Sequence, residues 1–375
     1  MKNNTSLKEY LSKSPIGYEQ WEKYLNNIDR FNFIKGTRFG QKEVLGIWCG
    51  TEIFCNFFVK FGLSKENIGK KQFSMNFLHT TATYHWGCES KNKVIKDDVH
   101  FYVGASPFVY AHLLSANINK HKERTGTVFF MPRIDHGVKF NMESKEFDKL
   151  RELIKNAPQP VTILSYLDAP KMWHDKFSDL GDVNIISMVT EDSLWQFKLN
   201  NIFCSHKYAY IPNICSDIFY ATIAGCKAIH YDISDIFDIN YYTSSIIPSY
   251  HKSIVTETYF KFDNLLSNLF TFGDEITDEE YYVSYKMLSV DKMEHPKDLR
   301  LTCQRLSAIS NIIRYETDFH MSIEYVRSFT DENIPHYLRS EFDNSEKAYF
   351  NKNIFDDRFN SIGTISYIDE ILDEI

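Results

Sequence analysis

Residues 124–232 alternate five short apolar runs with segments of helical character, and this alternation constrains the fold more than any other feature of the chain. The runs are continuously apolar, as expected for strands that are covered on both faces. Strands that alternate with helices in this way form a parallel sheet. We expect strands at 126–131, 161–166, 183–187, 208–211 and 227–231, and helices at 144–155, 170–178, 192–202 and 216–224.

The segments on either side of this region predict a smaller α/β unit and a helical end. Before it, we expect helices at 7–30, 51–61 and 108–116 and strands at 43–49, 72–79 and 99–104. The charged segment 117–124 is interpreted as a linker, which predicts a domain boundary near residue 120. After it, we expect helices at 277–287, 296–315 and 365–375, and we interpret 341–360, dense in Asp, Asn and Lys, as the most mobile segment.

Composition excludes several classes of protein. A chain of 375 residues fits two domains. Its net charge of −8 argues against a general nucleic-acid binder, because such proteins neutralise phosphates with a surplus of Lys and Arg. The seven cysteines form no C-x-x-C pair and indicate reduced thiols in the cytosol. The chain has neither a signal peptide nor a run of about 18 apolar residues. We therefore expect a soluble cytoplasmic protein, and peripheral contact with the inner membrane stays open.

Motifs for metal, P-loop and dinucleotide chemistry are missing from the sequence. The carboxylates of Asp232, Asp235 and Asp238 form no Asp-x-Asp motif after an apolar strand, and no His-Glu-x-x-His occurs. No Gly-x-Ser-x-Gly, Walker A or Gly-x-Gly-x-x-Gly motif occurs either. We expect no metal site and no resident cofactor.

The last strand-and-helix unit, residues 213–230, offers a candidate binding turn. A polar turn leads into a helix that ends at Gly225, and a buried strand follows. Ser216 or Asp217 can cap this helix, and its free backbone N–H groups suit a phosphate or a hydroxyl-rich ligand. The alternative is purely structural, with Ser216 or Asp217 as an N-cap and Gly225 as the residue after the helix.

This unit, in which a small-residue turn and a helix precede Ala-Gly-x-x-x-hydrophobic, resembles the donor-nucleotide segment of bacterial GT-B glycosyltransferases that build capsule, lipopolysaccharide or O-antigen glycans. Residues 126–136 resemble the first strand and loop of such donor domains, in which Gly-Thr, an apolar run and Pro lead into a polar loop with His. The resemblance covers residues 121–235. It departs from the family after Pro132, where Arg133 stands in place of a small hydroxyl residue and His136 comes three residues later.

The resemblance implies two Rossmann-like domains that face a cleft, with C-terminal helices packing back across it. Residues 1–120 would form the acceptor side, 121–315 the nucleotide-sugar donor domain and 316–375 a helical extension. The implied reaction moves a sugar from a nucleotide-sugar donor to a bacterial surface glycan or glycolipid acceptor, without metal and by default with inversion. A transferase of CMP-activated sialic acid or Kdo, a nucleotide-sugar epimerase and a non-catalytic sugar-binding component of a polysaccharide assembly complex remain alternatives.

Candidate donor contacts follow the ends of the expected strands. An Arg133 fork can hold a diphosphate, and the same loop can also be an ordinary charged surface loop. At this edge the resemblance places base and ribose, where a tyrosine ring can stack on a base. The candidate donor-binding residues are Arg133, Ser165, Tyr166, Asp168, Asn213, Ser216, Asp217 and Tyr220.

Inverting transfer needs a general base for the acceptor hydroxyl. His79 and His85 belong to a polar, Thr-rich segment of the amino-terminal unit and are candidates for this base, as is Asp135. Asp135 and His136 could also orient the sugar. Each histidine taken singly is more often structural or solvent-exposed. The candidate catalytic residues are His79, His85, Asp135 and His136.

Overall fold

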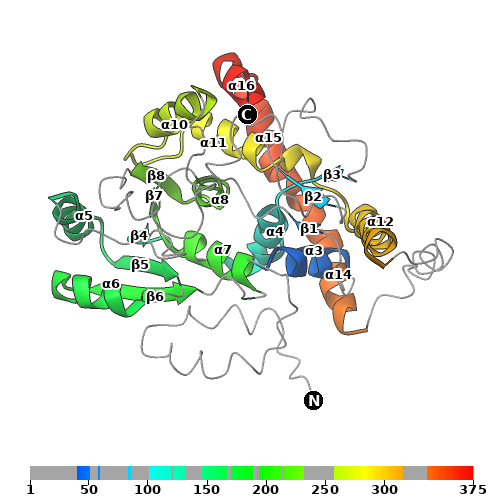
Figure 1. Cartoon of the computed structure of the whole chain (residues 1–375), viewed down its shortest axis with the longest axis horizontal. Coiled ribbons are helices and arrows are strands. Elements are labelled where there is room, and N and C mark those ends of the chain that lie inside the picture. Colours follow the sequence, from blue (N-terminus) through cyan, green and yellow to red (C-terminus); the bar gives the residue numbers. More distant parts are fainter. Residues whose placement is uncertain are drawn as a thin grey trace.

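The computed structural model describes residues 40–50, 58–59, 83–86, 101–119, 122–131, 145–166, 170–188, 192, 194–212, 215–231, 257–315 and 336–374. Their dominant feature is a five-stranded parallel sheet of order β6-β5-β4-β7-β8 (Figure 1). Its strands are β4 (Thr127–Phe130), β5 (Val161–Tyr166), β6 (Val183–Met188), β7 (Tyr208–Pro212) and β8 (Lys227–Tyr231). All five strands that the sequence predicts are confirmed, within one or two residues.

Helices cover both faces of this sheet, as in Rossmann-like folds. Helices α5 (Lys145–Asn156) and α6 (Pro170–Phe177) pack with Phe129, Ile163 and Ile185 on one face, and the short helix η3 (Ser178–Leu180) follows α6. Helices α7 (Trp195–Ser205) and α8 (Asp217–Ile223) pack with Val128 and Leu164 on the other. Because neighbouring residues along a strand point to opposite faces, a continuous apolar run serves both layers.

A second, small sheet is also entirely parallel. Its order is β1-β2-β3, from β1 (Phe58–Val59), β2 (Thr83–His85) and β3 (Phe101–Val103). Helix α4 (Pro107–Asn119) follows β3 and packs against α7 and α8 of the large sheet. One hydrophobic cluster joins Trp48 and Tyr84 to Phe130 and Phe219. The core is thus continuous across residue 120, and the division into domains there stays a prediction.

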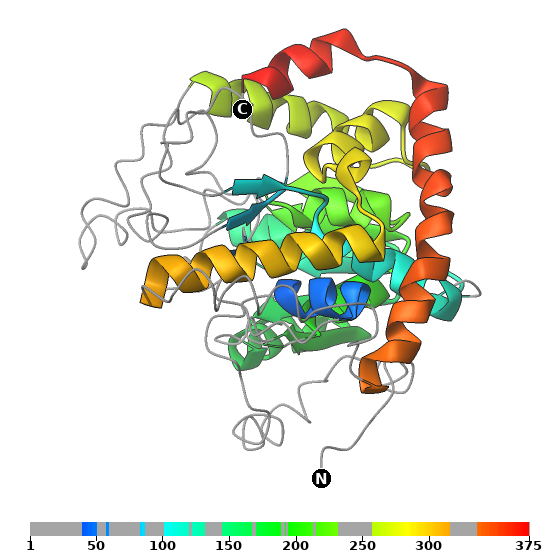
Figure 2. The ribbon, with the colours of Figure 1, turned by 90° about the vertical axis from the view of Figure 1, so that its right-hand side faces the viewer.

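Helices form the carboxyl-terminal part of the chain. They are α10 (Glu257–Leu269), α11 (Asp278–Met287), η5 (Val290–Lys292), α12 (Pro296–Tyr315), α14 (His336–Tyr349), η7 (Phe350–Lys352), α15 (Asn353–Ile362) and α16 (Ser366–Asp373). Figure 2 shows α14 and α15 running along one side of the molecule. Helix α14 contacts α3 (Gln41–Cys49) and α4, α15 contacts α11, and α16 contacts α10. Among the described helices, none is both long and apolar enough to cross a membrane.

Three predictions of local structure are wrong. Residues 43–49, expected as a strand, lie in helix α3, which begins after Gly40 and ends at Gly50, both with positive φ. Apart from Gly46, its buried residues follow helical spacing: Gln41, Val44, Leu45, Trp48 and Cys49. The expected helix at 51–61 is described only at 58–59, where strand β1 lies. Residues 341–360 fall in α14, η7 and α15, because Phe342, Ala348 and Phe355 are buried. The expected elements at 7–30 and 72–79 lie outside the described residues.

Candidate functional site

The order of the strands marks one position on the large sheet as the expected ligand site. From β4 the chain proceeds to β5 and β6 on one side, then returns to β7 and β8 on the other. In open parallel sheets, ligands bind outside the carboxyl ends of the strands where the order reverses. That point lies between β4 and β7, which pair directly. The segments that follow these two strands begin at residues 131 and 213.

Several candidate residues belong to those two segments. Arg133 follows the end of β4 by three residues, and Asn213 comes directly after Pro212, the last residue of β7. Arg133, Asp135, His136 and Asn213 lie outside the described residues, as do His79 and Asp168. The expected proximity of the loop at Arg133 to Asn213 rests on the pairing of β4 with β7 alone.

The carboxyl ends of the small sheet reach the same region. Strand β2 ends at His85, and the ring of the next residue, Trp86, lies 5.9 Å from the ring of Tyr220 on α8. Strand β3 is followed by residues 104–106 and then α4, where the Phe108 ring stacks on Tyr220 at 4.3 Å and 14°. In Figure 1, α4 and α8 lie between the two sheets. The ends of β2, β3 and β7 therefore meet around Tyr220.

The phenol of Tyr220 is under the influence of two serine side chains. They belong to Ser106, which follows β3, and to Ser216, which precedes α8. Ser216 lies one helical turn before Tyr220, and residues four apart share a helix face. Burial raises the pKa of Tyr220 well above its ordinary value, and the two serine hydroxyls oppose that rise. Tyr220 is therefore a neutral phenol, with 3% of its surface exposed.

The turn before α8 has its own geometry. Ser216 occupies the N-cap position in helical conformation without a side-chain capping bond, so the hydroxyl does not serve as a conventional cap. Its carbonyl accepts hydrogen bonds from the N–H groups of Phe219 and Tyr220, both at 3.1 Å. Asp217 is half-buried, and its Oδ2 lies 3.7 Å from Cys215 Sγ. Gly225 has a φ of 80° after the helix, in agreement with the structural interpretation of that glycine.

Ser165 and Tyr166 end strand β5 at the same edge of the sheet. Strand β5 adjoins β4 on the side away from β7, so these residues flank the reversal point. Ser165 is fully buried and lies opposite Ser187 of β6. Of the candidates, the structure brings Ser216, Asp217 and Tyr220 together with the strand that ends at His85.

No family model matches the chain, and no curated protein matches it significantly. Within the described ranges, no three His, Cys, Asp or Glu side chains gather as metal ligands.

Ser106 and Phe108 are parts of this region that the sequence does not predict. Gly104-Ala-Ser-Pro107 is recognisable only as a break between a strand and a helix. The structure explains why residue 104 is a glycine, because a Cβ there would lie 2.2 Å from the Tyr84 hydroxyl oxygen. That hydroxyl donates to the Ala105 carbonyl at 2.8 Å. This hydrogen bond holds the turn after β3 against strand β2.

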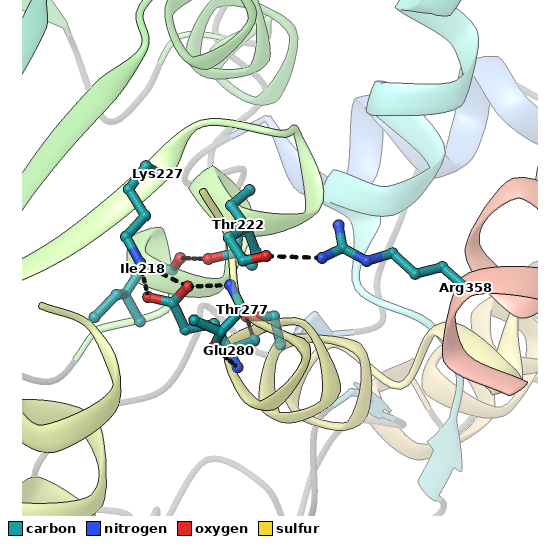
Figure 3. Close-up of polar contacts among 8 residues, drawn as sticks. Ile218, Thr222, Lys227, Thr277, Glu280 and Arg358 are labelled. Atoms are coloured by element: carbon teal, nitrogen blue, oxygen red, sulfur yellow. Dashed lines mark hydrogen bonds and ion pairs between the residues drawn. The ribbon is translucent and has the colours of Figure 1, made fainter. Parts of the chain in front are cut away.

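A buried charge pair lies at the opposite edge of the sheet. Lys227, the first residue of β8, donates to both carboxylate oxygens of Glu280 on α11, at 2.6 and 2.8 Å (Figure 3). The Thr277 N–H donates to the same carboxylate at 2.7 Å. Burial raises the pKa of Glu280, and Lys227 and Thr277 oppose that rise. This pair fastens α11 to the sheet, and it stands apart from the candidate site.

Proposed function

We propose that the chain is a glycosyltransferase that moves a sugar from a nucleotide-sugar donor to a bacterial surface glycan or glycolipid. The observation that carries the proposal is the convergence of strand ends from two parallel sheets around Tyr220. A transferase needs donor and acceptor side by side, and two facing sheet edges can supply one site each. The strands β4 and β7 supply the donor edge, and β2 and β3 supply the acceptor edge.

The proposed chemistry assigns a role to each edge. Arg133 and the turn at 213–217 hold the diphosphate and sugar, while Ser165, Tyr166 and Asp168 hold base and ribose. His85 takes the proton from the acceptor hydroxyl as its oxygen forms a bond to the anomeric carbon. The bond between that carbon and the phosphate oxygen breaks, and the nucleotide leaves with its charge balanced by Arg133. His79 and Asp135 are the other candidates for the base, and His136 would orient the sugar.

The test is turnover with a panel of UDP-, GDP-, dTDP- and CMP-sugars, measured as nucleotide release and, in parallel, as protection from thermal unfolding. Arg133→Ala and Asn213→Ala should each reduce turnover about 100-fold or more with unchanged folding, since loss of one group that stabilises developing charge has that order of effect. Lys155→Ala is the matched control, because it removes an exposed cation at the end of α5, on the amino side of β5.

The outcomes separate the alternatives. Protection by CMP-sugars alone would favour a transferase of sialic acid or Kdo. Conversion of a nucleotide sugar without release of nucleotide would indicate an epimerase, and binding without turnover would indicate a sugar-binding component. Absence of protection by every member of the panel would contradict the proposal. Full turnover in both variants would show that the donor site lies elsewhere.

A further inference from the structure

The last residue of β8, Tyr231, reaches across the large sheet at its carboxyl edge. Its hydroxyl donates to the carbonyl of Phe130, the last residue of β4, at 2.8 Å. Strand β7 lies between β8 and β4. The Tyr231 ring packs edge-to-face against the stacked rings of Phe129 and Tyr210, with centroids 6.3 and 6.2 Å away. The phenol thus extends from β8 to the point where the strand order reverses.

The residue at position 212 explains why the Phe130 carbonyl takes its donor from a side chain. The Met131 N–H donates to the Leu164 carbonyl of β5 at 2.9 Å, so the backbone groups of Phe130, one residue earlier, face β7. By the register of β4 with β7, the next donor to the Phe130 carbonyl would be the backbone nitrogen of residue 212. That residue is Pro212, which has no N–H. The ladder between the two strands therefore lacks its last bond.

We infer that Tyr231 is a positioning residue whose hydroxyl replaces the bond that Pro212 cannot make and so holds the end of β4 at the reversal point. Phe130 is 1% exposed, and a buried carbonyl is costly to leave without a donor. Loss of the hydroxyl should therefore loosen the strand end beside which the donor phosphates are proposed to bind. This consequence for donor binding rests on the proposed function, whereas the replacement of the ladder bond does not.

The first experiment needs no ligand. Tyr231→Phe keeps the ring contacts and removes the hydroxyl, and hydrogen exchange at the Met131 amide reports the end of β4. We expect about three- to tenfold faster exchange there, since a hydrogen bond of ordinary net strength corresponds to that factor. The matched control is Tyr208→Phe at the amino end of β7, where the hydroxyl donates to Asp274 Oδ1 at 3.1 Å. It should leave exchange at Met131 unchanged.

A second substitution tests the replacement itself, because Pro212→Ala supplies the missing N–H. In the wild-type background the Phe130 carbonyl keeps its donor, so exchange at Met131 should change by less than about twofold. In the Tyr231→Phe background the new N–H can complete the ladder, and exchange at Met131 should return to within about twofold of the wild type. Additive losses in the double variant would overturn the inference, as would unchanged exchange in Tyr231→Phe alone.

The second experiment measures donor affinity. The nucleotide sugar that stabilises the wild-type protein most should bind Tyr231→Phe about three- to tenfold more weakly, with the larger effect in KM than in kcat, and should bind Tyr208→Phe normally. Equal affinity for the wild type and Tyr231→Phe would overturn the positioning role. If no nucleotide sugar binds the wild type, the proposed function fails, and the exchange measurements still decide whether Tyr231 replaces the ladder bond.

Discussion

The buried ion pair between Lys227 and Glu280 offers the sharpest test of how this fold is held together. Lys227 has 5% of its side chain exposed and Glu280 has 1%. Glu280→Gln removes the charge while keeping the size of the side chain. It leaves an ammonium group buried without its counter-charge and weakens the bond from the Thr277 N–H. Breaking one partner of a buried pair costs about 3–5 kcal/mol, so we expect Glu280→Gln to lower the free energy of unfolding by about that amount.

Replacement of both partners should cost less than replacement of one. In Lys227→Met/Glu280→Met no charge remains buried, and apolar side chains of similar volume often restore most of the lost stability. The control is Glu374→Gln at the exposed pair with Lys261, whose atoms lie 3.0 Å apart with 43% and 44% exposure. We expect a change there of about 0–1 kcal/mol.

The assay is urea unfolding followed by tryptophan fluorescence, with the free energy taken from the midpoint and slope. Two results would refute the reasoning. One is a Glu280→Gln variant as stable as Glu374→Gln. The other is a double variant that loses at least the sum of the losses of Lys227→Met and Glu280→Met measured separately, because this would mean that packing and not the buried charge determines the cost.

Three further predictions concern stability. Gly126→Ala should lower the free energy of unfolding in urea by more than about 2 kcal/mol, because φ is 65° and a Cβ would lie 2.0 Å from the Pro160 carbonyl oxygen. Its control, Gly181→Ala, has a φ of 95° and open space around the added Cβ, so it should cost only the backbone strain of about 1 kcal/mol. Burial lowers the pKa of His206 below 6.5 and so favours its neutral form in the folded protein. The stability that depends on this neutral form is present above pH 6.5 and is lost as the pH falls. His206→Gln should therefore flatten the dependence of the unfolding midpoint on pH. Arg300→Leu should cost about 2–4 kcal/mol in the same assay, because the buried guanidinium donates to the carbonyls of Cys49, the last residue of α3, and of Gly50 after it, at 3.2 and 2.6 Å.

The sequence predicts the large sheet well because each strand is buried on both faces and carries a continuous apolar run. The same criterion fails at residues 43–49, where an apolar run belongs to helix α3. Its buried residues recur at intervals of three and four, and Gly40 and Gly50 bound it. That spacing and those glycines are present in the sequence, so helical periodicity could have identified α3.

The sequence predicts only the part of the candidate site that belongs to the large sheet. The turn at 213–217 has a local signature, and it follows in sequence from β7, which pairs with β4. Phe108 carries no such signature, because it reaches Tyr220 from the helix that follows a strand of another sheet. Contacts between elements so distant in sequence depend on how the two sheets pack. Tyr220 lies four residues after Ser216 and therefore shares a helix face with it. On that face its ring stacks on Phe108 of α4 and is buried.

The central claim is that a nucleotide sugar binds where strand ends from both sheets meet. A structure of the protein with the best-stabilising nucleotide sugar tests it most directly. We expect the nucleotide across the carboxyl ends of β4 and β7, with its phosphates beside Arg133 and the turn at 213–217 and its sugar directed toward the end of β2 at His85. A nucleotide bound at the amino ends of the strands, near Lys227, or on the outer faces of α5 and α6, would contradict the claim.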